Sequence, residues 1–515
     1  MLPVALQNKT IDNDVLKYIK ELQFEILKIK EEYALLIYKR FARSAERLPI
    51  DEKQQLLFTC EAETTEETED EDQHELFEVK SYTRKKPGRK PLDPKLERRE
   101  TIIDIDEDEK TCACGATLTR IGEEISEKLQ IIPMQIYVEK IVRPKYACRS
   151  CEGTEDEDES AVKIAPVPPS IIPRSIASPS LLSTIFTYKF ERHLPYYRQE
   201  KLYEQIGTEI SRQDMSNWQQ QVHRNLTPLF SLLKETVKGG PVIQMDETTV
   251  QVIGEEDRLD TSNRRFAKSY MWLARGGPPD KKVIWYEYHP TRAAYNAKAF
   301  LEGYSGYLQT DGYDGYDAAV REMPGVIHVG CFAHARRHFY EASKATKKPK
   351  SAEEGIKYIR KLYHIENEMR AQCKDDERFL FERKRHAAPV LDDFKSWLVR
   401  RSEEVPPTLK LGKAIAYSLS QWDKMVSYLE SPYLTPDNNA CENAIRPFVL
   451  GRKNWLFNQS PKGAESSCGM FTLIETAKQN GLVPFQYLMA LFEKAPLAKT
   501  PEDWENLLPW NIFTA

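Results

Sequence analysis

The sequence contains no long apolar run and no apolar leader. None of its segments approaches the roughly 20 apolar residues that a membrane-spanning helix needs. The first residues, MLPVALQNKTIDNDVL, lack the basic start and apolar stretch of a secretory signal. These absences argue against a membrane partner and favour a cytoplasmic protein.

Cysteine is also scarce, and it is unevenly spread. The chain has nine cysteines, an odd count that does not suit a disulfide framework. Four of them form two close pairs, Cys112 with Cys114 in CAC and Cys148 with Cys151 in CRSC, and the other five are scattered. This pattern predicts one metal site and several buried thiols in a reducing compartment.

What is present is a long, charged chain with charges of each sign grouped together. A length of 515 residues suggests roughly three or four domains, and 41% hydrophobic content can supply a core. The net charge of -5 by itself argues against nucleic-acid binding. However, residues 61–75 carry nine acids and no Lys or Arg, whereas residues 80–100 carry nine bases against three acids.

The first 50 residues predict a coiled-coil helix. Apolar residues recur in steps of four and three over about residues 13–48, at Val15, Ile19, Leu22, Ile26, Ile29, Tyr33 and Leu36. This spacing is a heptad seam, and it predicts pairing with a second protomer. The alternative is a single amphipathic helix packed on its own protein. Residues 51–79 follow as an acidic linker that is too polar to bury.

Residues 80–100 form a basic segment around PGRKP. A short Arg-Lys core between Pro and Gly stays extended and fits an A·T-rich minor groove, so the segment resembles an AT-hook. A flexible basic linker is the alternative. The candidate DNA contacts are Arg84, Lys85, Lys86, Arg89 and Lys90.

The two cysteine pairs lie within residues 101–165, which we predict to be a zinc-binding ribbon. An alternating, strand-like run, IIPMQIYVEKIV, separates the pairs. Four thiolates suit a closed, structural Zn²⁺ site formed by Cys112, Cys114, Cys148 and Cys151. The first pair is C-x-C rather than C-x-x-C, which leaves four reduced thiols as the alternative.

Residues 166–230 predict a helix-turn-helix-like DNA-binding domain. Three short helical patterns occur there, Gly207 separates the last two, and Ser211 with Asp214 forms a capping-box-like start. The exposed face of the third pattern would present Arg212, Gln213 and Asn217 to DNA. A plain helical hairpin is the alternative.

From residue 239 to 340 the pattern changes to three strand-like runs followed by alternating helices and strands. This order predicts an RNase H-like catalytic core within an α/β multidomain chain. Asp246 falls on the first strand, in VIQMDETTV, and Asp311 directly follows the fourth, in YLQTDGYDGY. The neighbouring Glu247 points to the opposite face of the strand, and Asp314 and Asp317 are predicted to be solvated residues at a helix start.

A helical insertion is predicted over residues 341–430, and the core resumes over 431–484 before a C-terminal segment at 485–515. The resumed core contains a third acid, Glu442, on a short helix that Asn438 or Asp437 caps and Pro447 ends or kinks. The same stretch supplies candidate DNA contacts, namely Arg446, Arg452, Lys453 and the stacking plane of Trp455.

Asp246, Asp311 and Glu442 come from separate elements of one core, and three such carboxylates suit a metal-dependent phosphoryl-transfer site. Mg²⁺ prefers oxygen ligands, and two such ions can clamp the attacking and leaving oxygens of an in-line displacement. Cys331 and His334 have Cys-x-x-His spacing beside this core. We interpret them as packing and orienting residues rather than as a second zinc site, because two further ligands are missing.

Many collinear blocks resemble the insertion sequence 66 family of bacterial transposases. They run in order from about residue 40 to the C-terminus and include QMDETTV, LQTDGYDGY, HVGCFAHARRHF, ENAIRPFVLGRKNWLF, IETAKQNGLVPFQYL and LLPWN. The resemblance implies a DDE triad on an RNase H-like fold, and by motif this triad is Asp246, Asp311 and Glu442. The C-x-C pair and the acidic run at 152–159 depart from the family pattern.

The resemblance implies a bacterial DNA transposase that binds terminal inverted repeats and catalyses DNA cleavage and strand transfer. It would use Mg²⁺ or Mn²⁺ at the triad and Zn²⁺ in the ribbon, and it would act near the nucleoid. Its partners would be double-stranded DNA, a second copy of the chain and accessory proteins of the same element. The alternative is a catalytically silent or domesticated DNA-binding relative. A nuclease acting on RNA–DNA hybrids is disfavoured by the DNA-binding modules of the N-terminal half.

Overall fold

The computed structural model describes residues 13–41, 98–100, 129, 134–147, 162–253, 268–346 and 349–513. The chain divides into two compact units, one made of Met1–Ala62 with Arg143–Ala515 and the other of Glu63–Val142. In the second unit, residues 134–142 form neither helix nor strand, so the strand predicted there is absent over those residues. None of the helices described could span a bilayer. All elements below belong to the first unit.

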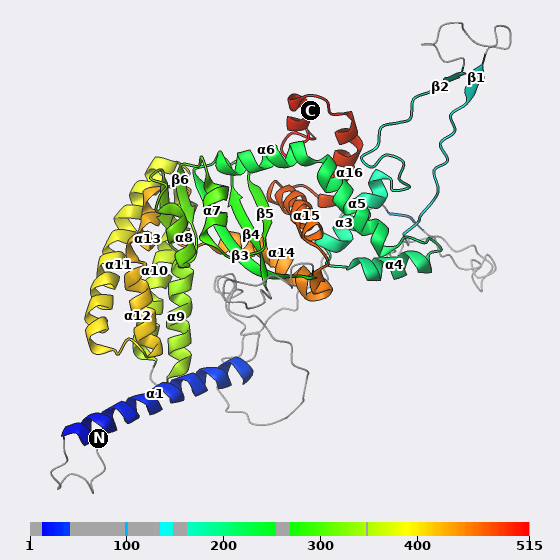
Figure 1. Cartoon of the computed structure of the whole chain (residues 1–515). Helices are drawn as coiled ribbons and strands as arrows, with labels where there is room; N and C mark the ends of the chain where they lie inside the picture. Colours follow the sequence, from blue (N-terminus) through cyan, green and yellow to red (C-terminus); the bar gives the residue numbers. More distant parts are fainter. Residues whose placement is uncertain are drawn as a thin grey trace, which may run out of the picture. The chain divides into compact units, whose positions relative to one another are not determined.

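A six-stranded mixed sheet forms the centre of this unit (Figure 1). Its strands are β3 (Val242–Val252), β4 (Ser269–Gly276), β5 (Val283–His289), β6 (Gly306–Gln309), β7 (Val326–Val329) and β8 (Phe457–Asn458). The order is β5-β4-β3-β6-β7, with β8 paired to the far end of β3. Strands β3, β4 and β5 pair antiparallel, whereas β6 and β7 run parallel to β3. The predicted succession of three antiparallel strands and then alternating helix and strand is confirmed.

Helices connect and cover these strands. They are α6 (Thr227–Lys238), α7 (Ala294–Leu301), α8 (Asp314–Val320), α9 (Phe332–Ala345), α14 (Asn439–Trp455) and α15 (Pro461–Gln479). Helix α15 protects the edge strand β5, because the Thr476 hydroxyl accepts a bond from the Ile284 amide and the Thr472 hydroxyl accepts one from the Tyr286 amide. An edge strand would otherwise leave these amides unpaired.

A helical insertion separates β7 and α9 from α14, as predicted. It consists of α10 (Lys350–Gln372), α11 (Asp376–Glu404), α12 (Lys410–Ser420), α13 (Trp422–Val426) and the 3₁₀ turn η4 (Ser427–Glu430). Figure 1 shows these helices bundled beside α9. Phe339 of α9 packs with Phe394 and Trp397 of α11 in a second hydrophobic core, which also includes Val329 of β7.

The predicted helix-turn-helix region forms α3 (Pro179–Phe190), α4 (Tyr196–Gln205) and α5 (Arg212–Asn225). Gly207 takes the left-handed conformation, with φ at 81°, and ends the turn after α4. Ser211 caps α5 by accepting the Asp214 amide at 3.1 Å. The buried face of these helices belongs to the same hydrophobic core as the sheet, which also includes α15 and α16 (Pro484–Lys494). The chain then ends through η5 (Ala495–Leu497) and α17 (Pro501–Glu505).

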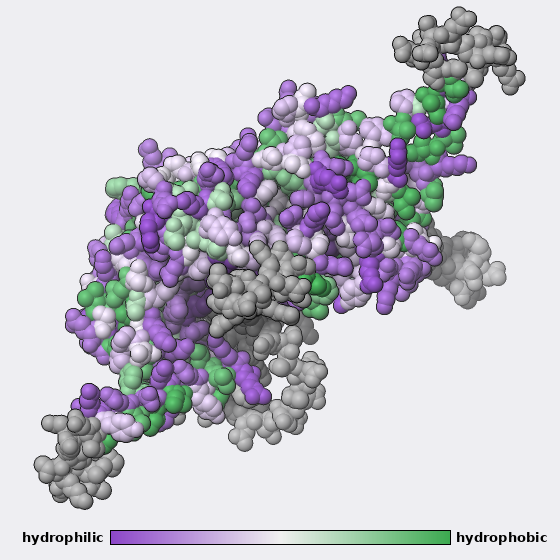
Figure 2. Space-filling view, viewed as in Figure 1, coloured by the Kyte–Doolittle hydropathy of each residue, from purple (hydrophilic) through white to green (hydrophobic). Residues whose placement is uncertain are grey.

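The N-terminal helix α1 spans Asn13–Phe41 and confirms the predicted helix over those residues. It contacts α9, where the Tyr38 hydroxyl lies 2.7 Å from that of Tyr340, and Leu35 is its one buried side chain among those described. The predicted heptad seam does not face this contact, because Ile29 is 62% and Tyr33 64% exposed. Figure 2 shows apolar side chains on the visible surface of α1.

A short antiparallel hairpin of β1 (Lys145–Ala147) and β2 (Val162–Ile164) flanks the second cysteine pair. Arg143 tethers this hairpin by donating a bond of 2.6 Å to the carbonyl of Ala165. The predicted zinc ligands Cys112, Cys114, Cys148 and Cys151 and the basic residues Arg84, Lys85, Lys86, Arg89 and Lys90 lie outside the described residues.

Candidate active site

Asp246 lies on the central strand of the sheet, and Asp311 lies just beyond the strand beside it. Strands β3 and β6 are parallel, with Gln244 opposite Gln309. Each aspartate follows its glutamine by two positions, so the two acids stand at matching positions along the two parallel strands. The glutamines fix this register further, because the Gln244 side-chain amide donates to the Gln309 side-chain oxygen at 2.8 Å.

Glu442 reaches the same place from the first turn of α14. The start of this helix is anchored beside Asp246, because the Asn438 side-chain amide donates to the Met245 carbonyl at 2.9 Å. Farther along, the Tyr286 hydroxyl of β5 donates to the Ala444 carbonyl. The structure therefore brings together the three acids that the sequence singled out.

The carboxylates are close enough to affect each other's ionisation. Burial raises the pKa of Asp246 well above its usual value, and the charges of Glu247, Glu442 and Asp311 raise it further. Burial likewise raises the pKa of Glu442 to about 7, against the lowering effect of Arg337. A cation bound between such carboxylates offsets their repulsion and favours their ionised forms.

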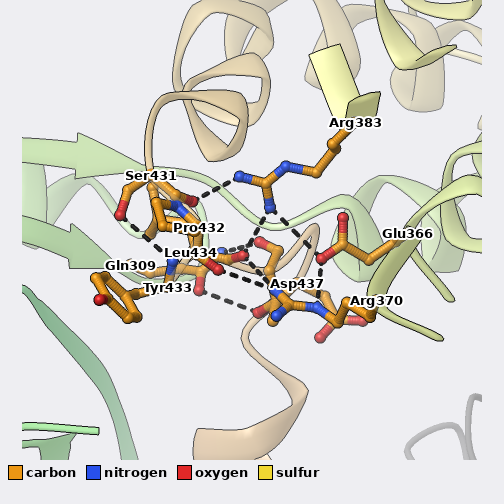
Figure 3. A network of polar contacts seen from close by, with 10 residues as sticks. Gln309, Glu366, Arg370, Arg383, Ser431, Pro432, Tyr433, Leu434 and Asp437 are labelled. Atoms are coloured by element: carbon orange, nitrogen blue, oxygen red, sulfur yellow. Dashed lines mark hydrogen bonds and ion pairs between the residues drawn. The ribbon is translucent and has the colours of Figure 1, made fainter. Parts of the chain in front are cut away.

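The loop between η4 and α14 is held by two arginines of the insertion (Figure 3). Arg383 of α11 is fully buried, and it donates to the carbonyls of Ser431 at 2.6 Å and Leu434 at 3.0 Å. Arg370 of α10 donates to the same Leu434 carbonyl at 2.9 Å. Both arginines pair with Glu366, at 2.7 Å from Arg370 and 3.5 Å from Arg383.

The same loop is also tied to the sheet. Gln309 stands two residues before Asp311 in the chain. Its side-chain amide donates to the Thr435 carbonyl at 2.6 Å (Figure 3). The insertion and strand β6 therefore set the entry of α14, and with it the position of Glu442.

Helix α14 differs from the predicted short, capped helix. It continues through Pro447 to Trp455, so the proline does not end it. Asn438 stands at its N-cap, but its side-chain oxygen accepts no capping bond, and its side-chain NH2 group donates to the Met245 carbonyl. Asp437 instead accepts the Asn439 amide at 3.0 Å.

An arginine and a tyrosine that the sequence did not reveal contact the Glu247 side chain. The Glu247 side chain is only 1% exposed, and it pairs with Arg292 and accepts a bond from the Tyr316 hydroxyl. Arg292 also stacks over the ring of Tyr313, 3.7 Å from its centroid. Neither Arg292 nor Tyr316 has a local sequence signal, because the fold alone brings α8 and the loop before α7 to this strand.

Helix α9 contributes His334 and Arg337 to the surroundings of Glu442. His334 Nδ1 lies 3.8 Å from one oxygen of Glu442, and Arg337 lies 3.9 Å from the other. Burial lowers the pKa of His334 to about 4. Together with Cys331, His334 and Glu442 form a group whose ligand atoms all lie within 4.8 Å of one another.

The acids at the start of α8 have different surroundings. Asp314 is exposed, as expected. The expectation of a solvated residue is wrong for Asp317, which lies 2.7 Å from His328 Nδ1 and 2.6 Å from Lys424 Nζ. Asp317 thereby links α8 to β7 and to the insertion.

The predicted DNA contacts on α14 differ in how exposed they are. Lys453 is exposed, and Arg446 is half-buried near Glu442, whose pKa it lowers. Arg452 is engaged by β3, with a bond of 3.1 Å to the Thr248 hydroxyl. Trp455 packs edge-on against Phe190 and at a tilt against Phe471, so its ring lies against the core rather than forming an open stacking plane.

The predicted contacts on α5 lie on its outer face. Arg212, Gln213 and Asn217 are exposed, and the Gln213 amide donates to Asn217 at 3.0 Å. The opposite face of α5 is fixed to α15, because the Gln219 amide donates to the Ser466 hydroxyl at 2.7 Å.

Residues 174–466 match the model of the Transposase IS66 family, and this range includes all three acids. The chain belongs to this family. Three further IS66-type models match: the zinc-finger binding domain of transposase IS66 over 109–152, the IS66 C-terminal element over 472–510, and Transposase C of IS166 homeodomain over 28–101. This IS66 membership assigns the chain to the transposases of insertion sequences.

Related proteins occur in Sinorhizobium fredii. This IS66 chain is 30% identical over 430 residues to the uncharacterized protein y4jD, covering 81% of each chain. It is 31% identical over 454 residues to y4hP, which covers 84% of this chain and 78% of the relative. It is 30% identical over 455 residues to y4qI, covering 85% and 81% respectively.

The family implies a divalent metal at the acids and zinc at the cysteine module. The described residues fit a cation at the acids. Asp246 is half-buried, and the charges of Glu442 and Asp311 both raise its pKa, a repulsion that a bound cation would relieve.

Proposed function

We propose that this IS66-family chain binds the terminal inverted repeats of its insertion sequence and cleaves and joins DNA at Asp246, Asp311 and Glu442. The observation that carries this proposal is the convergence of three half-buried carboxylates, from β3, the end of β6 and α14, two of which raise the pKa of the third. Separate elements of one core supply the ligands, as a phosphoryl-transfer site requires.

The strand order supports an RNase H-like core. Three antiparallel strands, followed by parallel strands joined through helices, place the first acid on the central strand and the second after its neighbour. We assign this core to residues 239–340 and 431–484, with the insertion at 341–430 and the C-terminal segment at 485–515. The N-terminal modules keep their predicted boundaries, namely 1–50, 51–79, 80–100, 101–165 and 166–230.

Oxygen ligands alone suit Mg²⁺ or Mn²⁺ at the triad, whereas the four cysteines of residues 101–165 suit structural Zn²⁺. When bound at the triad, the divalent ion supplies Lewis-acid activation of the attacking oxygen and neutralises the leaving oxygen. Asp246 and Asp311 would hold it from the rigid sheet, and Glu442 would complete the site from α14. The pairing of Glu247 with Arg292 keeps a fourth carboxylate out of the ligand set.

DNA would be held by cationic groups around the three acids and by the N-terminal modules. Arg446 and Lys453 lie on the helix that carries Glu442, and Arg212 is exposed on α5. Phosphate contacts of this kind make affinity fall steeply with salt. The active form would be a dimer or higher oligomer in the bacterial cytoplasm, with accessory proteins of the element as further partners.

A strand-transfer assay on DNA carrying the terminal repeats tests the triad. We expect Asp246→Asn, Asp311→Asn and Glu442→Gln each to lower metal-dependent strand transfer by on the order of 10³-fold, because each removes charge stabilisation worth several kcal/mol. Asp314→Asn is the matched control, since Asp314 is exposed next to the site, and it should retain wild-type activity.

Undiminished activity of Glu442→Gln would refute the triad assignment. A wild-type chain that binds the repeats but transfers no strand with any divalent ion would favour the alternative, a catalytically silent DNA-binding relative.

A further inference from the structure

Three side chains with metal-binding chemistry meet between the starts of α9 and α14. Cys331 occupies the N-cap of α9, His334 lies in its first turn, and Glu442 lies in the first turn of α14. Their ligand atoms all fall within 4.8 Å of one another, and this is the one such group among the residues that the structure describes.

Two of these atoms are buried and lack hydrogen bonds. His334 Nδ1 and Glu442 Oε1 have no partner within the described part of the chain, and they stand 3.8 Å apart, too far for a hydrogen bond. A buried polar atom without a partner costs about 1–3 kcal/mol. A cation between the two would satisfy both.

The third atom is already oriented toward the same space. The Asn438 amide donates to Cys331 Sγ at 3.2 Å, so the start of the helix that carries Glu442 also fixes the thiol. Outer hydrogen bonds of this kind orient metal ligands. The second Glu442 oxygen faces Arg337 at 3.9 Å, which leaves Oε1 for the ion.

We propose that Cys331, His334 and Glu442 bind a divalent ion of the zinc class. A thiolate, an imidazole and a carboxylate together select Zn²⁺ or Co²⁺ over Mg²⁺, and three protein ligands leave one position open. Ligands around a tetrahedral zinc ion stand roughly 3.3–3.8 Å apart, so a shift of about 1 Å closes the observed group. The thiolate and carboxylate balance the charge of the ion.

This site adjoins the proposed Asp246–Asp311 pair, and Glu442 belongs to both. The sequence suggested only packing for Cys331 and His334, because it supplied two ligands. The fold supplies the third from a helix more than a hundred positions away.

Metal content of the purified full-length chain tests the proposal, with Zn²⁺ or Co²⁺ alone as the probe. We expect Cys331→Ala to hold one metal equivalent fewer than the wild type. Cys441→Ala is the matched control, because Cys441 is equally buried and adjoins Glu442 but lies outside the group. Both variants keep the cysteine module at 109–152, so its zinc cancels from the difference.

The Co²⁺-loaded protein gives a second readout. Its thiolate-to-cobalt absorption should fall in Cys331→Ala and remain in Cys441→Ala, and His334→Gln should also lose one equivalent. His334→Gln carries the test if thermal unfolding shows that Cys331→Ala does not fold. Equal metal content in the wild type and both site variants would overturn the proposal.

The outcome is separable from that of the proposed function. Asp246→Asn and Asp311→Asn should abolish strand transfer while keeping the full metal count at Cys331 and His334. Inactivity of these variants combined with no metal loss in Cys331→Ala would leave the triad standing and remove this site.

Discussion

At the residue scale, the fold keeps several ionisable groups in surroundings that disfavour their charge. Lys189 of α3 is an example away from the acids. Its ammonium lies 3.9 Å from the ring centroid of Tyr196 and donates to Gln219 at 3.2 Å, and no carboxylate of the described residues pairs with it. Burial lowers its pKa from 10.5 to about 7.

A pH dependence follows from this lysine. Its charge destabilises the folded state most fully below pH 7, and the penalty disappears as pH rises from 7 toward 10.5, because only the unfolded chain stays protonated there. We therefore expect Lys189→Met to stabilise the protein at pH 6.5 by up to about 2 kcal/mol more than at pH 9. Urea unfolding at the two values measures this difference. Lys201→Met, at an exposed position of α4, should show none.

The residues that sequence reasoning found and missed differ in a physical way. Asp246 and Asp311 each follow an apolar strand run, so local pattern predicts where they stand. Arg292, Tyr316 and Arg337 acquire their roles only through packing between elements distant in the chain. The pairing of Asp317 in α8 with Lys424 in the insertion could not be predicted from the sequence for the same reason.

At the scale of elements, the insertion holds the loop that leads to Glu442. Two arginines bond the carbonyls of this loop, and the Arg383 side chain is 0% exposed. Hydropathy pattern predicted the helices of the insertion but not this clamp. It also missed the continuation of α14 through Pro447, where packing on the sheet outweighs the local cost of proline.

Removal of the clamp should be costly. Arg383→Ala leaves the Ser431 carbonyl without its arginine, and leaves Glu366 and the Leu434 carbonyl with Arg370 alone, so we expect about 3 kcal/mol of destabilisation. Strand transfer at a temperature where the variant is folded should fall roughly 10–100-fold, because Glu442 is no longer held in place. Chemical denaturation and the transfer assay measure the two effects. Lys384→Ala, the exposed neighbour, should change neither.

The exposed seam of α1 predicts association through this helix. Ile26 and Ile29 are 51% and 62% exposed, and α1 contacts α9 by a different face. A second copy of the chain would bury the seam, as the heptad pattern predicts. The double change Ile26→Glu and Ile29→Glu should convert a dimer to a monomer in sedimentation velocity. Lys28→Glu, off the seam, should leave the dimer intact, and a wild-type monomer would refute the coiled coil.

At the scale of the whole molecule, the helices predicted as a separate DNA-binding domain share one hydrophobic core with the sheet. Gln219 of α5 bonds to Ser466 of α15 across that core. Sequence pattern located each helix but could not reveal the shared core, because the apolar face of a helix does not specify which element it packs against. A DNA end bound on α5 would thus be rigidly coupled to the sheet that bears Asp246.

The position of a bound metal tests the central claim most directly. The full-length chain should be crystallised with a pre-cleaved terminal-repeat end and Mn²⁺, and the ion located by its anomalous scattering. We predict an ion roughly 2.0–2.3 Å from carboxylate oxygens of both Asp246 and Asp311, next to the DNA 3′ end. A bound 3′ end with no ion between these two residues would contradict the account.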